Sequence, residues 1–269
     1  MKNYISIDKR VNDYRKDSIT IDFSKAEKSS TELLEKQYPY IAQNRTLNNQ
    51  FRMMLSIYRK DGVESAYYGE ERFCYKHELP FTGVLHKHEF IEIFYVIEGS
   101  FEQILLGEHH FFKKGEFVIT DQNCEHSDYL IPVDASVMFL MISSDYLDEL
   151  LHCYDEKDEL QRFLFHAINR QKREQSFLQL KEMNDGRDQS LRILEQLFEE
   201  MIGNELGTNE VRKGLLIRLL RHLCVNYRPI LNSDTQEGKE KATLYEVERY
   251  IRIHLADVTS STLEETFHY

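Results

Sequence analysis

Residues 83–99 read Gly83-Val-Leu-His86-Lys-His88-Glu-Phe-Ile-Glu92-Ile-Phe-Tyr-Val-Ile-Glu-Gly99. The β-branched and aromatic run in the second half of this stretch predicts a strand, and its final glycine predicts a turn. Side chains of a strand alternate between its two faces, so His86, His88 and Glu92 share a parity. Imidazole and carboxylate groups gathered on one face suit Mn, Fe, Ni, Cu or Zn.

A second stretch adds a third imidazole, because residues 115–126 form another strand and turn that end in His126. On a straight strand Glu92 would lie about 13 Å from His88, too far for ligands of one ion. The chain therefore has to bend between Glu89 and Ile91 if these groups are to meet. Two interpretations stay open: a metal site made by His86, His88, Glu92 and His126, or a pocket in which they hydrogen-bond a ligand or one another.

The stretch lies within a region of short strands. From about residue 51 to residue 142, runs rich in Ile, Val, Phe and Tyr alternate with turn signals such as Glu98-Gly99 and Lys113-Lys114-Gly115. This spacing predicts an antiparallel sandwich or barrel. From Ser143 onward apolar residues recur at helical spacing, notably over 190–202 and 210–227.

Composition narrows the class of protein. The 269 residues carry 34 basic and 46 acidic side chains, a net charge of −12, which is not the usual footprint of a nucleic-acid binder. No apolar run approaches the ~20 residues needed to span a bilayer, and the N-terminus has no apolar signal region. We expect a soluble, cytoplasmic protein with reduced cysteines, of which Cys124 is interpreted as a buried thiol. A nucleophile elbow and a Gly-rich phosphate loop are both missing from the sequence, so a covalent or nucleotide-dependent enzyme has no support.

The spacing His-x-His-x3-Glu-x6-Gly, followed by a Gly and a later His, resembles the two motifs of the cupin family over roughly residues 66–143. The resemblance implies a double-stranded β-helix barrel, and the bend that the ligand set requires. Asp121 and Asn123 depart from the Pro and Gly usual in the second motif, and the first Gly stands closer to His86 than usual.

The C-terminal residues carry a second resemblance. The segment from Val247 to Leu255 resembles the opening helix of the DNA-binding domain of AraC/XylS-family transcription regulators. Residues 258–269 resemble the scaffold helix of its first helix-turn-helix, with Leu263, Phe267 and Tyr269 as partial scaffold. Ser260 and Glu264 replace the usual Leu and Ala; alternatively, Ser261 and Glu264 form a capping box and the helix begins later. The given sequence stops before the recognition helix, so we expect no sequence-specific DNA binding from it.

These observations predict five regions. They are an N-terminal arm (1–50), a cupin-like sensing barrel (51–145), a helical linker and dimerisation region (146–230), a flexible linker (231–243) and a truncated AraC-type helix-turn-helix domain (244–269).

The leading hypothesis is the sensing and dimerisation portion of an AraC-type regulator that responds to a small-molecule effector. It is not an enzyme and requires no cofactor, although a divalent transition metal is an open alternative for the barrel. We expect a homodimer, with Leu216, Leu219 and Leu223 forming either a helix–helix interface or a face packed on their own barrel. The alternatives are a metal-dependent cupin oxygenase or isomerase using His86, His88, Glu92 and His126, and a stand-alone ligand-binding dimer.

Overall fold

The structure is a computed structural model that describes residues 18–21, 50–60, 62–68, 72–78, 85–122, 124–129, 134–151, 160, 163–164, 177–183, 187–202, 205–230, 259 and 261–263. The chain divides into two compact units, Met1–Arg228 and Pro229–Tyr269. Among the described residues, every helix is too short or too polar to span a bilayer.

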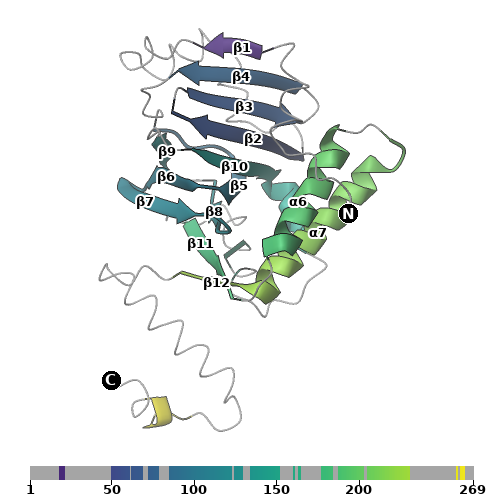
Figure 1. Cartoon of the computed structure of the whole chain (residues 1–269). Coiled ribbons are helices and arrows are strands. Elements are labelled where there is room, and N and C mark those ends of the chain that lie inside the picture. The colour runs from purple at the N-terminus through teal and green to yellow at the C-terminus, as the bar shows by residue number, and fades with distance from the viewer. Residues whose placement is uncertain are drawn as a thin grey trace. The chain divides into compact units, whose positions relative to one another are not determined.

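The first unit is built on two sheets (Figure 1). The described strands are β1 (Ser18–Ile21), β2 (Phe51–Arg59), β3 (Gly62–Tyr68), β4 (Arg72–Glu78), β5 (Phe90–Glu98), β6 (Ser100–Leu105), β7 (Glu108–Lys113), β8 (Phe117–Thr120), β9 (His126–Tyr129), β10 (Ala135–Ser143), β11 (Phe177–Glu182) and β12 (Tyr227–Pro229). Nine of them form a large sheet in the order β1-β4-β3-β2-β10-β5-β8-β11-β12, and three form a small sheet in the order β7-β6-β9. This arrangement confirms the predicted mainly β, barrel-like domain.

The centre of the large sheet is buried on both faces, as strand β10 shows. Its sequence, ASVMFLMIS, lacks the polar alternation of a half-exposed strand. Met138 and Leu140 point into an apolar cluster shared with the helices. Val137 and Phe139 point into a second cluster inside the barrel, which includes Phe101 from the small sheet.

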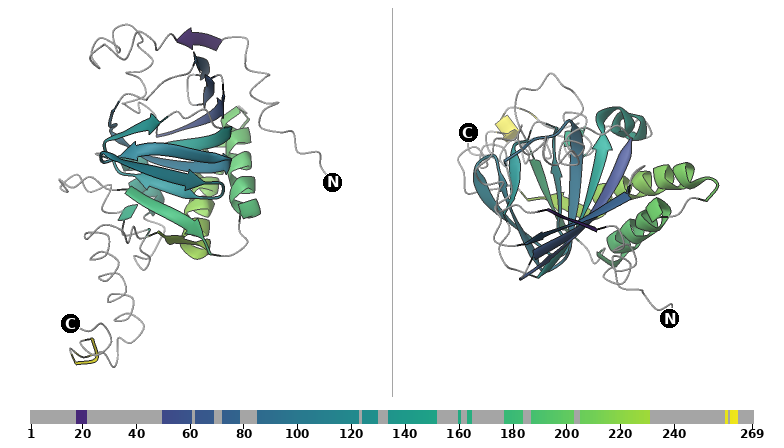
Figure 2. Two further views of the ribbon diagram at one scale, coloured as in Figure 1. Left: turned by 60° about the vertical axis from the view of Figure 1, so that its left-hand side comes forward. Right: turned by 90° about the horizontal axis from the view of Figure 1, so that it is seen from above.

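Three described helices follow the barrel: α4 (Ser144–Leu151), α6 (Arg187–Ile202) and α7 (Thr208–Asn226). Helices α6 and α7 lie side by side on the outer face of the large sheet (Figures 1 and 2). Leu216, Leu219 and Leu223 of α7 are each 1% exposed and belong to the cluster on this face. Of the two roles that the sequence left open for them, these contacts support packing within their own chain. A dimer contact through α7 would have to use exposed side chains such as Val211 and Val225.

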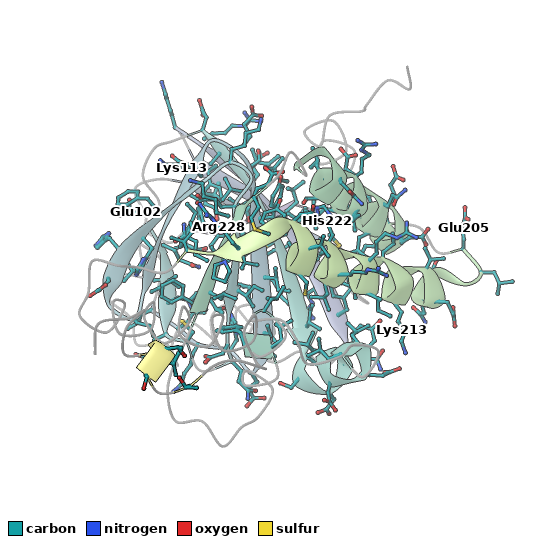
Figure 3. All side chains as sticks on the ribbon, turned by 90° about the horizontal axis from the view of Figure 1, so that it is seen from below. Glu102, Lys113, Glu205, Lys213, His222 and Arg228 are labelled. Atoms are coloured by element: carbon teal, nitrogen blue, oxygen red, sulfur yellow. The ribbon has the colours of Figure 1, made fainter. Side chains whose placement is uncertain are left out.

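A buried polar network fixes the end of α7. The Ser190 hydroxyl lies 2.9 Å from both the Tyr227 hydroxyl and Nε2 of His222, and His222 faces the sheet from α7 (Figure 3). Asn226 Nδ2 donates to Nδ1 of His222 at 3.0 Å. His222 therefore carries its proton on Nε2 and donates to Ser190, so it cannot activate that hydroxyl as a base. The network ties α6, α7 and β12 together and has a structural role.

Strand β11 was not predicted, because the region 146–230 was interpreted as helical. It pairs antiparallel with β8, with Leu178 opposite Ile119 and Leu180 opposite Phe117. The strand has six residues and only one fully buried position, so its sequence indicates a strand only weakly. Its partner strand lies about 60 residues earlier in the chain, where local sequence patterns cannot reveal the pairing. Together with β1 and β12, this strand extends the large sheet beyond residues 51–145.

The turn between β5 and β6 depends on Gly99. Its φ is +75°, a conformation that L side chains rarely adopt. A Cβ at this position would lie 2.1 Å from the carbonyl oxygen of Asp134. The sequence prediction of a turn here is confirmed.

Within the second unit the described residues past Ile230 are few. Thr259 caps a helical turn: its hydroxyl accepts from the N–H of Thr262 at 3.2 Å, and its carbonyl accepts from the N–H of Leu263 at 3.1 Å. Ser261 is already helical, so it is not the capping residue that the alternative interpretation required. The predicted linker 231–243 and the scaffold residues Phe267 and Tyr269 lie outside the described residues.

Candidate metal centre

His88 and Glu92 are brought together at the start of β5. The chain bends at Glu89 and the strand begins at Phe90. The His88 ring stacks on the Phe90 ring, with centroids 3.8 Å apart and planes 7° from parallel. The bend required by the sequence is thus present, and it places Nε2 of His88 3.7 Å from Oε2 of Glu92.

His126 reaches the same place from the small sheet, where it opens β9. Its backbone forms a bridge with His86, in which each N–H donates to the other residue's carbonyl oxygen at 2.9 Å. Its Nε2 lies 3.8 Å from Oε1 of Glu92. The His126 ring centroid is 4.8 Å from that of His88. Two strands from different sheets therefore converge on one carboxylate.

The structure gathers three of the four predicted ligands into a compact group. One ligand atom each from His88, Glu92 and His126 lies within 4.8 Å of the others, and all three side chains are buried. His86 is partly exposed; its ring lies 4.4 Å from that of His126 but 6.1 Å from that of His88. It stands beside the group of three rather than within it.

Backbone carbonyls set the tautomers of both buried histidines. Nδ1 of His88 bonds the carbonyl oxygen of Phe90 at 3.0 Å, and Nδ1 of His126 bonds that of Cys124 at 2.9 Å. A carbonyl oxygen only accepts, so each Nδ1 carries a hydrogen and each Nε2 presents a lone pair toward Glu92. Such a bond from the second ring nitrogen is the usual way in which proteins orient a metal-binding histidine.

Burial controls the charge of the group. It lowers the pKa of His88 and of His126 to about 3 each, with the neighbouring His86 adding to the effect. Both rings are therefore neutral at physiological pH, as metal ligation requires. Burial also raises the pKa of Glu92 above its usual range. A cation among these atoms would reverse that shift, because it favours the ionised carboxylate.

The residues present fit a metal ion. Nε2 of His88 and Oε1 of Glu92 are buried and have no hydrogen-bond partner. The separations of 3.7 and 3.8 Å are too long for hydrogen bonds. Two ligands that are each about 2.0–2.2 Å from one ion lie at most about 4.4 Å apart. Both separations from Glu92 fall within this limit, and the spread of 4.8 Å over the whole group requires only a small side-chain adjustment to reach it. Two imidazoles and one carboxylate are a donor set for a first-row divalent metal.

Three further polar residues border the group and were missed by sequence reasoning. Gln103 on β6 pairs with Asp128 on β9, and Nε2 of Gln103 donates to Oδ1 of Asp128 at 3.0 Å. Burial, with the nearby Glu92 adding to the effect, raises the pKa of Asp128 to about 6. Thr120 on β8 lies directly opposite Glu92. For Asp128 the sequence held one indication: it lies two residues from His126, so the two side chains share a face of β9.

Cys124 is fully buried, as predicted, and burial raises the pKa of its thiol. A thiol that stays protonated is a poor metal ligand. Its contribution to the site is made by its backbone carbonyl, which orients His126.

Residues 80–142 match the family model of the cupin domain, and the mainly β fold described above fits a cupin barrel. A comparison with curated proteins found no match. The chain is similar to the crystal structure of apo ToxT from Vibrio cholerae, at 12% identity and a TM-score of 0.39, over 83% of this chain and 72% of that one. It is similar to KdgF from Halomonas sp., at 22% identity and a TM-score of 0.23, over 34% of this chain and 77% of that one. It is also similar to a cupin 2 conserved barrel domain protein from Salinispora arenicola, at 14% identity and a TM-score of 0.27, over 40% of this chain and 76% of that one.

Proposed function

We propose that this chain is the ligand-sensing part of an AraC/XylS-type transcription regulator, and that its barrel holds a divalent transition metal at His88, Glu92 and His126. The observation that carries the metal site is the convergence of two Nε2 lone pairs on one buried carboxylate. A small-molecule effector binds beside this centre.

The regulator role is supported by the order of the parts. A cupin match over residues 80–142 is followed by helices packed on the outer face of the barrel and by a tail that resembles the start of an AraC-type DNA-binding domain. DNA contact is proposed only for a chain that carries the recognition helix. We further propose a cytoplasmic homodimer that meets through the exposed side of α7. The effector acts by binding one arrangement of these parts more tightly than another.

The bound ion would supply a concentrated positive charge and open coordination positions for an oxygen atom of the effector. The protein supplies the rest. Backbone carbonyls hold the two imidazoles in the ligating tautomer, and the buried surroundings exclude competing water. Glu92 becomes an ionised ligand as the ion binds.

The test is metal content after purification without added metal or chelator. We expect close to one equivalent of a transition metal in the wild-type chain, and its loss in His88→Ala and in Glu92→Gln. The matched control is His109→Ala, which removes an exposed histidine that also pairs with a glutamate, Glu102, but lies outside the barrel site. Equal metal content in all four proteins would contradict the proposal.

A second candidate function is a metal-dependent cupin enzyme, since two histidines and one carboxylate also form the ligand set of non-haem iron oxygenases. Oxygen consumption distinguishes the sensor from the enzyme. Oxygen consumption by the Fe²⁺-loaded chain, abolished in Glu92→Gln, would favour the enzyme; metal binding without oxygen consumption favours the sensor.

A further inference from the structure

Two buried polar atoms beside the metal centre lack hydrogen-bond partners among the described residues. Oε1 of Gln103 and Oγ1 of Thr120 belong to side chains with 0% exposure, and neither atom has a hydrogen-bond partner. A buried polar group left unpaired destabilises the fold, because nothing replaces the hydrogen bonds that it made to water. Two such atoms next to one candidate site indicate that a bound molecule completes their hydrogen bonds.

Both side chains face the interior of the barrel. Gln103 lies two residues from both Phe101 and Leu105, which belong to the interior cluster, so it shares their face of β6. Thr120 shares a face of β8 with Val118 of the same cluster. Gln103 lies opposite Asp128, and Leu105 lies opposite His126 in the same pair of strands, so the glutamine and the metal-binding group occupy one region.

Asp128 fixes the direction in which Gln103 presents its amide. A carboxylate only accepts hydrogen bonds, so the amide nitrogen of Gln103 has to face it. The amide oxygen is then left to accept a hydrogen bond from another molecule. Carboxylates and sulfates are acceptors at neutral pH and cannot supply that bond by themselves.

The chemistry of the donor can be narrowed further. Thr120 offers a hydroxyl that both donates and accepts. An ammonium group beside a divalent ion would suffer like-charge repulsion, whereas a hydroxyl group is neutral and can donate to Gln103 while it accepts from Thr120. A hydroxyl group therefore has the donor that Gln103 needs and can also pair with Thr120.

We infer that Gln103, held by Asp128, and Thr120 form a subsite that binds a hydroxyl-bearing small molecule next to the metal centre. This inference rests on the proposed function, whose effector it assigns to a chemical class. Gln103 acts as the specificity-determining residue, because it rejects ligands that bring only acceptors.

The test compares two probes of equal charge, glycolate and methoxyacetate, in the second of which a methyl group replaces the hydroxyl hydrogen. Their dissociation constants are measured by titration calorimetry on the Zn²⁺-loaded full chain, and by ligand-observed NMR on the metal-free chain. We expect glycolate to bind about three- to tenfold more tightly, the contribution of one neutral hydrogen bond. The preference should disappear in Gln103→Leu.

Two further variants keep the comparison decisive. Thr120→Val, which retains the shape of the side chain, should weaken the preference even if Gln103→Leu fails to fold. Gln179→Leu is the matched control: Gln179 also donates to a carboxylate, that of Glu116, and should leave the preference unchanged.

The outcomes separate the two proposals. Zn²⁺ uptake without a glycolate preference, or with a preference that persists in Gln103→Leu and Thr120→Val, overturns the inference and leaves the metal site standing. Absence of Zn²⁺ uptake overturns the metal site. The subsite then stands only if the metal-free chain prefers glycolate, and it falls if that preference is missing.

Discussion

Replacing Thr120 with valine should stabilise the ligand-free protein. The Thr120 side chain is 0% exposed and its hydroxyl has no hydrogen-bond partner, so the folded state bears the full desolvation cost of that group. The cost is about 1–3 kcal/mol, and valine removes it while it keeps the shape and β-branching of threonine. For a domain of this size each kcal/mol raises the melting temperature by roughly 2–4 °C, so we expect a rise of roughly 2–12 °C.

The assay is thermal unfolding followed by circular dichroism, on protein treated with a chelator. Ser190→Ala is the control, because it removes a hydroxyl that bonds both Tyr227 and His222. That change should destabilise the fold by about 1–3 kcal/mol, since it removes two buried hydrogen bonds. A lower melting temperature for Thr120→Val, with Ser190→Ala behaving as expected, would refute the claim that Thr120 is kept for a ligand.

Three other predictions concern the fold. Gly99→Ala should cost about 2–4 kcal/mol in urea unfolding, because its Cβ meets the carbonyl oxygen of Asp134, whereas Gly107→Ala, with a φ of +84° and open space around it, should cost only about 1 kcal/mol; equal costs would contradict this reasoning. Burial lowers the pKa of His110 below 6.5, so as the pH falls through that value the unfolded chain takes up a proton first and the fold loses stability. His110→Phe removes this loss, and its stability relative to wild type should grow between pH 7.5 and 5.5; parallel curves would count against it. Leu219→Ala should cost about 2–5 kcal/mol at every protein concentration, since Leu219 is buried in its own chain; a concentration-dependent loss would instead indicate a dimer contact.

The sequence predicted those parts of the molecule that depend on local signals. The barrel followed from short apolar runs and glycine turns, such as the one at Gly99. Strand parity placed His88 and Glu92 on one face, and the rise per residue showed that they meet only if the chain bends between them. The bend itself was implied by the resemblance to cupins. These inferences needed no knowledge of which strands pair.

What the sequence did not predict depends on pairing between distant strands. Gln103 meets Asp128 only because β6 and β9 align in one register, and Thr120 lies opposite Glu92 only through the pairing of β5 and β8. Strand parity alone also predicted that His86 would join the other ligands, whereas in the structure its ring lies beside them. Its backbone bridge to His126 holds its ring to one side, which no periodicity in the sequence could indicate.

The large sheet described above begins with β1 and ends with β12, and both edge strands are short, at four and three residues (Figure 1). A short edge gives another chain few unpaired backbone groups on which to add a strand, and Pro229 removes one N–H from β12 altogether. Trimming either strand would expose a longer neighbour, the seven residues of β4 or the six of β11. Shortened versions of this protein should therefore aggregate more readily than the full chain, even where the barrel and its site remain folded.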